Sequence, residues 1–225
     1  AKYLPGLASA STIGALALTE PDAGSDAMGI RTTARPVDGG YLINGSKVFI
    51  TNGPIADVMV VYAKTNLEAG SRGITAFIFE TKTPGFRVAR KLSKVGLHGS
   101  PTGELVFEDA FVPEANVLGK VNEGYKIVMS GLDIERAFYA VIGVGTIEEA
   151  LHLSLKYAQE REQFGQPIAS FQLIQAKIAD MYTDLEAARQ VAHRAIWLAQ
   201  QEIRVSKETA AALLFVSRAA SRAAN

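Results

Sequence analysis

The chain has 225 residues, of which 48% are hydrophobic and 20% charged, as is typical of a globular protein with a sizeable core. Its 23 basic and 23 acidic residues give a formal net charge of zero, which argues against a nucleic-acid-binding protein. The lack of cysteine excludes disulfides, thiolate catalysis and cysteine-ligated metal centres. The three histidines show no metal-ligand spacing, so no metal site is expected.

Neither a membrane span nor a targeting segment is expected. No apolar run approaches the roughly 18 residues of a spanning helix. The N-terminal residues have neither the apolar stretch of a signal peptide nor the Arg/Ser-rich pattern of a transit peptide. We therefore expect a soluble protein that is not secreted.

The first half of the chain has the pattern of a β domain, with short apolar runs separated by Gly, Pro, Asn and Asp. Strands are expected at 13–18, 41–43, 47–51, 58–64, 73–80, 86–91 and 103–107. The Asn44-Gly45 pair lies between two of these runs and predicts a type I′ hairpin, because that turn needs positive φ at both central positions. Six to eight strands at this spacing indicate a small antiparallel barrel or sandwich.

The pattern becomes helical after residue 118. One helical stretch is expected from about Asn122 to Glu162, and Ser170 is a candidate N-cap for a second helix that follows Pro167. Steps of four and three residues in that second helix are typical of a bundle core and join Ile174, Ile178, Met181, Leu185, Ala188, Ala192, Ala195 and Ala199. The fold class predicted is therefore α+β and multidomain, with an antiparallel β-barrel or sandwich followed by a C-terminal helical bundle.

The segment Leu16–Asp26 carries the densest chemical signal. It is a strand that runs into a turn of small, hydrogen-bonding residues, which can present backbone N–H groups and hydroxyls to a ligand. An ordinary surface turn has the same composition, and the composition alone favours that interpretation over a ligand site.

This segment closely resembles the acyl-CoA dehydrogenase motif Thr-Glu-Pro, any residue, Ala-Gly-Ser-Asp, with Asp22 at the variable position. Further matches follow in the family's order at 49–51, 71–75, 94–96, 107–109, 112–113, 132–136 and 161–165. The string Met129–Arg136 is most similar to the isovaleryl-CoA dehydrogenase branch. The resemblance implies that residues 1–12 are the tail of an N-terminal helical domain, 13–118 the middle β domain and 119–225 an incomplete C-terminal helical domain.

FAD is the cofactor that the resemblance implies, in a site shared between subunits. Thr19 would donate to the pyrimidine edge of the flavin and Thr51 towards its N5 atom, and Phe49 stands where the family usually has Trp. The residues placed in this way at the FAD site are Leu16, Leu18, Thr19, Gly24, Ser25, Phe49, Ile50 and Thr51. Arg161, Phe164 and Gln172 would meet the FAD of a neighbouring subunit, which implies a homo-oligomer, with a homotetramer expected.

The substrate implied is an acyl-CoA thioester. Ser71 and Arg72 resemble a pair that contacts the CoA moiety, and Arg suits phosphate because its planar charged fork can bind two oxygens. Ser25, Asp133 and Arg136 match further substrate-contacting positions. Within the helix, Asp133 and Arg136 are i and i+3 neighbours and can form an ion pair.

Glu135 is the candidate catalytic base. Its apolar neighbours favour partial desolvation, which makes a carboxylate more basic. The residues alone favour an exposed helical Glu that pairs with a Lys or Arg. The resemblance favours the base, because isovaleryl-type enzymes carry their catalytic Glu at this helical position.

The implied reaction is FAD-dependent α,β-dehydrogenation of a short or branched acyl-CoA, with Glu135 removing the α-proton and hydride passing to flavin N5. Electrons would then pass to an electron-transferring flavoprotein. The location would be a bacterial cytoplasm or a mitochondrial matrix. Two alternatives remain: an acyl-CoA oxidase-like flavoenzyme, and a truncated non-catalytic relative that binds acyl-CoA or a partner.

Overall fold

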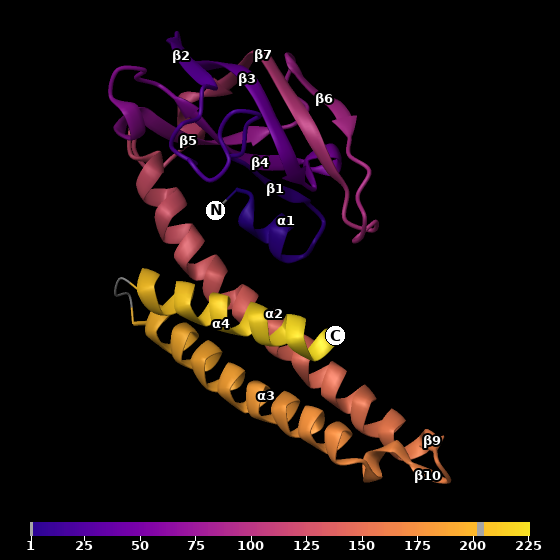
Figure 1. Ribbon diagram of the computed structural model, residues 1–225. Helices are drawn as coiled ribbons and strands as arrows, with labels where there is room; N and C mark the ends of the chain where they lie inside the picture. The colour runs from indigo at the N-terminus through magenta and orange to yellow at the C-terminus, as the bar shows by residue number, and fades with distance from the viewer. Residues whose placement is uncertain (1, 202–204) are drawn as a thin grey trace. The chain divides into compact units, whose positions relative to one another are not determined.

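The computed structural model describes residues 2–201 and 205–225. The chain forms two compact units, one extending to Val128 and the other starting at Met129. The first contains the large sheet, and the second contains α3, α4 and most of α2 (Figure 1).

The first unit is a β domain with one short helix, α1 (Leu4–Ala8). Its strands are β1 (Gly14–Ala17), β2 (Thr33–Val37), β3 (Gly40–Thr51), β4 (Val58–Lys64), β5 (Ile74–Glu80), β6 (Phe86–Lys91), β7 (Thr102–Pro113) and β8 (Val117–Leu118). They form one sheet in the order β6-β7-β3-β2-β4-β5-β8, with β1 beside β4. Short apolar runs ended by Gly, Pro and Asn thus fold as the strands that their composition favours.

The sheet is mixed rather than wholly antiparallel. β1 runs parallel to β4 from Gly14↔Val58 to Ala17↔Val61, and β2 meets β4 in parallel at Thr33↔Lys64. Parallel neighbours need a long connection, and here that connection between β1 and β4 contains β2 and β3. The end of β1 is thereby separated from the hairpins and leads into a loop of its own.

The prediction of a hairpin turn at Asn44-Gly45 is wrong. The turn between β2 and β3 lies at Asp38-Gly39 instead, and Asn44-Gly45 lies inside β3 at a shift in its register with β7. Asn44 Nδ2 donates to Asp109 Oδ1 at 2.8 Å, and Asp109 N donates back to Asn44 Oδ1 at 2.9 Å. Gly45 has φ 148°, and a Cβ there would lie 2.6 Å from Thr32 Oγ1. Between Ile43↔Ala110 and Gly45↔Phe107, β7 has one residue more than β3, so Asn44-Gly45 lies opposite a bulge of β7 at Asp109 and against Thr32 instead of forming a turn.

The core of the β domain is a single apolar cluster to which most of the strands contribute, including β1, β2, β3, β4, β5 and β7. Phe79, Phe86 and Phe107 have ring centroids 5.1 to 5.4 Å apart, and Tyr41 contacts Phe77 edge-on at 5.2 Å. Aromatic rings in these geometries add to the stabilisation from buried apolar area. The sheet therefore curves around one core, and this gives its outer face and strand ends a rigid support.

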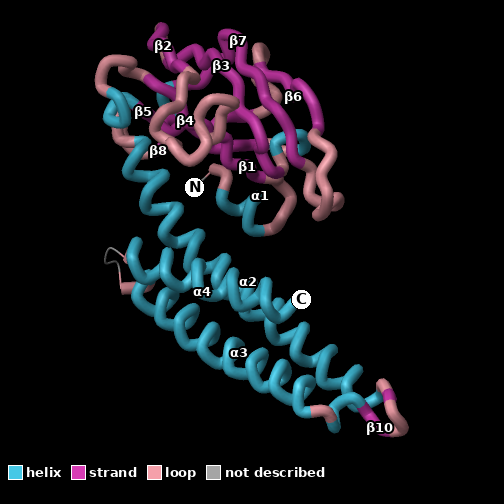
Figure 2. The backbone as a smooth tube through the Cα atoms, viewed as in Figure 1, coloured by secondary structure: helices cyan, strands magenta, loops and turns pink. Residues whose placement is uncertain are grey.

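The second unit is a helical bundle formed by α2 (Gly124–Glu160), α3 (Gln172–Ala199) and α4 (Ser206–Ala224) (Figure 2). A small hairpin of β9 (Glu162–Gln163) and β10 (Gln166–Pro167) lies between α2 and α3. The predicted stripe is confirmed as core, since Leu185, Ala188, Ala192 and Ala195 are buried and Ile178 and Met181 pack against them. Small residues in this stripe let the helices approach closely.

The sequence predicted Ser170 as the N-cap of α3, and this prediction is wrong. It belongs to a 3-10 turn at Ile168–Ser170, and the helix begins at Gln172 with Phe171 in the cap position and no side-chain cap bond. Among the described helices, none combines the length and apolar character that membrane crossing requires.

We predict that Gly45→Ala lowers the free energy of unfolding by about 2 kcal/mol or more, because a side chain is strained at this φ and meets Thr32. Gly39→Asn is the matched control: Gly39 has φ 73° with open space around it, and Asn tolerates the left-handed region. Urea titration followed by circular dichroism measures both. Equal, small losses for the two variants would contradict the bulge assignment.

Candidate functional site

Two segments far apart in the sequence meet beside the end of β1. Val48 N in β3 donates to Thr19 O at 2.9 Å, so the residues after β1 lie along the last part of β3. The β3–β7 register shifts again between Lys47 and Ile50, and Phe49 has φ 59°. A bulge redirects side chains. Here the side chain of Phe49 is 67% exposed, whereas that of Ile50 is only 2% exposed.

An apolar surface with two hydroxyls results. Leu16 and Phe49 are exposed hydrophobic side chains, Thr19 is half-buried and Thr51 is exposed. Within the described residues, neither threonine hydroxyl has a side-chain hydrogen bond. Apolar contact with a few free polar groups is the usual composition of a cofactor site. The side chain of Ile50 lies in the core, so this residue can reach a ligand only through its backbone, and Leu18 is half-buried.

A loop at residues 21–30 follows Thr19 and Glu20. Gly24 and Ser25 are exposed on this loop, and the space where a Gly24 Cβ would lie is open. Within the loop, Glu20 and Ala23 exchange backbone hydrogen bonds at 3.0 and 3.2 Å. Backbone N–H groups in such a turn can face an anionic ligand.

A buried ion pair that the sequence did not indicate holds the two ends of this loop together. Lys47 Nζ lies 2.8 Å from Glu20 Oε1, with 0% and 6% of the two side chains exposed. The ammonium also donates to Leu18 O at 2.9 Å. The Glu20 carboxylate accepts from Arg31 N at 2.6 Å and from Thr32 N at 3.0 Å. The pair thus fastens both ends of the loop to β3.

One signal could have located Lys47. Every second side chain of a strand points to the same face, so residues 43, 45 and 47 share one face of β3, and Ile43 on that face is in the core. A Lys at an inward position of a strand requires a buried partner, because an unpaired buried charge is very costly. The sequence did not indicate that the partner is Glu20, which is distant in the chain.

The pair shifts the pKa of both groups. Burial lowers the pKa of Lys47 to about 8, although the Glu20 carboxylate acts in the opposite direction. Burial alone would raise the pKa of Glu20. The Lys47 charge and the donated hydrogen bonds together outweigh burial and lower the pKa of this carboxyl below its usual 4.5. Both groups are therefore charged near neutral pH.

Ser71 and Arg72 lie on the same β unit, in a 3-10 turn at Gly70–Gly73 between β4 and β5. Both side chains are exposed. Among the described residues, no hydrogen bond or ion pair joins them to Leu16, Thr19, Phe49 or Thr51. Both side chains are therefore accessible to an anionic ligand.

The helical unit positions the predicted triplet on α2. Arg136 Nη1 donates to Asp133 Oδ1 at 2.9 Å, which confirms the expected i, i+3 pair. Ser206 Oγ, at the start of α4, donates to the other oxygen of Asp133. Glu135 is exposed and has no ion-pair partner within the described residues. The expected partial desolvation of Glu135 is therefore absent in this chain by itself, although Ile134 and Phe138 are exposed apolar neighbours.

The three residues predicted to meet a neighbouring subunit's flavin lie at the β9–β10 hairpin. Arg161 precedes the hairpin, and its carbonyl accepts from Ile168 N at 2.8 Å. Phe164 has φ 53° and is 92% exposed. Phe164 and Gln172 line one shallow groove of about 640 Å³. The structure thus brings Phe164 and Gln172 together, with Arg161 at the start of the same hairpin.

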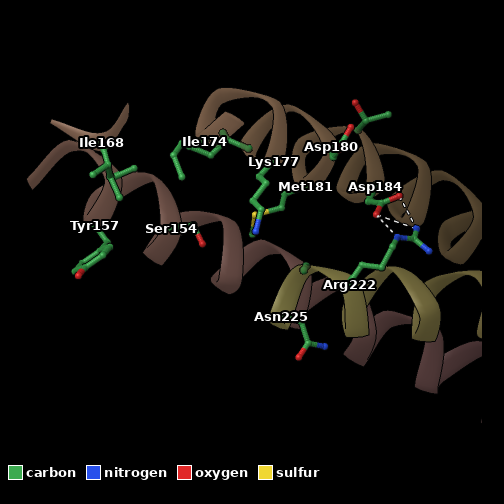
Figure 3. Close-up of a pocket in the computed structure, with 14 residues that line it drawn as sticks. Ser154, Tyr157, Ile168, Ile174, Lys177, Asp180, Met181, Asp184, Arg222 and Asn225 are labelled. Carbon is green, nitrogen blue, oxygen red and sulfur yellow. Dashed lines mark hydrogen bonds and ion pairs between the residues drawn. The ribbon is translucent and has the colours of Figure 1, made fainter. Parts of the chain in front are cut away.

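A second cavity in the helical unit, of about 810 Å³, is lined by none of the predicted site residues (Figure 3). Lys177 and Met181 point into it, and Arg222 pairs with Asp184 at 2.8 Å on its wall. In the part of the chain that the structure describes, no cluster of His, Asp and Glu could hold a metal ion.

Comparison with known proteins identifies the family. The acyl-CoA dehydrogenase middle-domain model matches residues 15–110, and the acyl-CoA dehydrogenase C-terminal-domain model matches residues 122–225. The chain therefore belongs to the acyl-CoA dehydrogenase family, a family of flavoprotein oxidoreductases, and the resemblance seen in the sequence is confirmed.

Individual relatives agree with this assignment. A mitochondrial 2-methylacyl-CoA dehydrogenase of Solanum tuberosum is 54% identical and a mitochondrial isovaleryl-CoA dehydrogenase of Oryza sativa subsp. japonica 53%, each over 188 residues, 84% of this chain and 46% of the relative. The solved butyryl-CoA dehydrogenase of Megasphaera elsdenii has a TM-score of 0.95 at 43% identity, covering 99% of this chain and 58% of that one. The predicted fold class is thus confirmed. The chain spans about half the length of the curated relatives it matches.

We predict that Glu20→Gln destabilises the protein by about 3 kcal/mol at pH 7, because it leaves the Lys47 ammonium buried without a counter-charge. The lowered pKa of Glu20 contributes stability that is present above pH 4.5 and lost as the pH falls further. The difference between wild type and variant should therefore shrink below pH 4.5.

Asp22→Asn serves as the control, because Asp22 pairs with Arg31 while both side chains are largely exposed. Its effect should be small at every pH. Chemical denaturation from pH 3 to 8 measures all three proteins. A Glu20→Gln deficit that is constant with pH would contradict the charge pairing.

Proposed function

We propose that the protein acts as an FAD-dependent acyl-CoA dehydrogenase that introduces a double bond between the α and β carbons of an acyl-CoA. The observation that carries this proposal is the surface formed by Leu16, Thr19, Phe49 and Thr51, where residues of two family motifs meet through the Val48–Thr19 hydrogen bond. Family membership alone does not assign this activity, since function depends on the site.

The residues of this surface fit a flavin. Exposed Leu16 and Phe49 offer apolar contact to a flat ring, and the hydroxyls of Thr19 and Thr51 can donate hydrogen bonds to its polar edge. The exposed loop with Gly24 and Ser25 can present N–H groups to anionic parts of a ligand. When bound, FAD supplies the two-electron acceptor for the substrate's β-hydrogen. The protein supplies placement and polarity.

Glu135 is the proposed base that takes the α-proton of the thioester. Asp133 is engaged by Arg136 and Ser206, whereas Glu135 is free of an ion pair among the described residues. A free carboxylate can accept a proton from a substrate. An acyl group bound over exposed Ile134 and Phe138 would exclude water from this carboxylate and favour proton abstraction.

The substrate contacts proposed are divided between both units. Arg72 is an exposed cation suited to the CoA phosphates, with Ser71 beside it, and Ser25 lies on the loop near the flavin surface. Asp133 and Arg136 would define the polar side of the site around Glu135. A short or branched acyl group is proposed, because the 54% and 53% identical relatives are named for 2-methylacyl-CoA and isovaleryl-CoA.

Assembly and partners follow from the same family assignment. We propose a homotetramer in which Arg161, Phe164 and Gln172 complete the FAD site of a neighbouring subunit, and exposure of all three supports this role. An electron-transferring flavoprotein is the proposed electron acceptor. The proposed domain division is residues 1–12, 13–118 and 119–225, and the location is a bacterial cytoplasm or a mitochondrial matrix.

We predict that Glu135→Gln slows flavin reduction by short acyl-CoAs by about a thousandfold without preventing their binding, because it removes the base and keeps the shape of the side chain. Anaerobic stopped-flow absorbance at the flavin band measures the rate. Glu149→Gln, at an exposed position further along α2, is the control and should bleach the flavin normally.

A normal rate in Glu135→Gln would refute the base assignment. Rapid reoxidation of the reduced wild-type flavin by oxygen would favour the oxidase alternative. A protein that gains no flavin spectrum with added FAD would favour the non-catalytic one.

We further predict that Arg161→Ala weakens FAD binding by about tenfold and leaves the oligomeric state intact. The substitution removes an exposed guanidinium, and with it a charged hydrogen bond to an FAD phosphate. Fluorescence titration with FAD and light scattering measure the two properties. Lys177→Ala, which removes a cation at the 810 Å³ cavity of the same unit, is the control. Equal FAD affinity in all three proteins would contradict the shared site.

A further inference from the structure

The buried Lys47–Glu20 pair has a geometry that joins three segments of the β unit. Lys47 belongs to β3, Leu18 and Glu20 follow β1, and Arg31 and Thr32 precede β2. One carboxylate and one ammonium connect all three by four hydrogen bonds between 2.6 and 3.0 Å. Charged hydrogen bonds of this length, out of contact with water, are among the strongest in proteins.

The position of the pair differs from that of a general core contact. The apolar cluster of the β domain consists of hydrophobic residues, most of them in the strands, whereas the pair joins β3 to the residues at both ends of the 21–30 loop. Taking two charges out of water costs several kcal/mol, and apolar residues of similar volume often stabilise a protein as well or better. The pair therefore calls for an explanation other than stability.

Its hydrogen bonds act on the residues that face the proposed ligand. Thr19 lies between Leu18, whose carbonyl Lys47 holds, and Glu20. The loop with Gly24 and Ser25 begins after Glu20 and ends at Arg31, so the Glu20 carboxylate closes it at the neck. On the other strand, Lys47 precedes the bulge that exposes Phe49. Thr19 and Phe49 are thus one and two residues away from the pair, and Gly24 and Ser25 are on the loop that it closes.

We infer that Lys47 and Glu20 are positioning residues, which fix Thr19, the 21–30 loop and the Phe49 bulge in the arrangement that binds the flavin. This inference rests on the proposed function. Neither residue contacts a ligand in this role, because both are buried. They act by setting the geometry of residues that do.

Variants of the pair can distinguish an effect on stability from an effect on the geometry of the site. In Lys47→Met the carboxylate still accepts from Arg31 N and Thr32 N, but it is buried without its counter-charge. In Glu20→Gln the ammonium is unpaired. The double variant Glu20→Gln/Lys47→Met carries no unpaired charge, so its thermal stability should return most of the way to that of wild type. It still lacks the charged bonds at the neck of the loop.

The experiment compares wild type, both single variants, the double variant and the control Glu108→Gln, which removes an exposed ion pair with Arg87 away from the loop. Melting temperature, FAD affinity by fluorescence, flavin reduction potential, and hydrogen exchange of the peptide that contains residues 21–32 are measured on each. We expect the double variant to regain its melting temperature, to bind FAD about tenfold more weakly, and to exchange faster at residues 21–32, because charged hydrogen bonds are lost there. Glu108→Gln should match wild type, because both side chains of its pair with Arg87 are largely exposed.

The role is refuted if the double variant regains FAD affinity, flavin potential and loop protection together with its melting temperature. Failure of the proposed function gives a different result. A wild-type protein that binds no FAD would contradict that function, while the exchange of residues 21–32 in the double variant would still test whether the pair orders the loop.

Discussion

The candidate site depends on one costly interaction, the burial of the Lys47 ammonium against the Glu20 carboxylate. A buried ammonium must satisfy its donors, and here Leu18 O and Glu20 Oε1 do so. The carboxylate has oxygens left over, and these accept from Arg31 and Thr32. Because each group needs the others, the loop and the strand can vary little in their relative positions. The need to pair these buried charges thus fixes the conformation of a loop that would otherwise be an ordinary surface turn.

Strand alternation explains how the same stretch of β3 serves both the core and the surface. Without a bulge, Phe49 and Thr51 would share the inward face of Lys47. The register shift after Lys47 instead exposes both of them and places Ile50 in the core. The sequence predicted a strand here correctly, since the apolar and β-branched residues favour one. It could not predict the bulge, because that depends on pairing with β7. The same limit explains the wrong hairpin at Asn44-Gly45, where Asp109 and Thr32 supply the contacts that make a bulge preferable.

Local spacing was a sound guide in the helical unit. The Leu185–Ala195 stripe and the Asp133–Arg136 pair both follow from positions three or four apart on a helix, and both are observed. The Ser206 hydroxyl on Asp133 lay beyond such reasoning, because it joins two helices through tertiary packing. The environment of Glu135 was inferred from neighbours in sequence, yet on a helix those neighbours point in different directions. Ala137 and Ala140 are buried, while Ile134 and Phe138 are exposed beside an exposed carboxylate.

The two candidate centres therefore differ in how their chemistry is prepared. In the β unit, polar groups are fixed before any ligand binds, and most of the cost of ordering them is met by folding. On α2, only Asp133 and Arg136 are fixed, and the carboxylate between them faces solvent. A base in that situation gains its reactivity when apolar surface covers it, so binding and activation become one event. Motifs in the sequence pointed to the residues that face ligands, whereas the residues that hold them in place became visible only through the contacts of the folded chain.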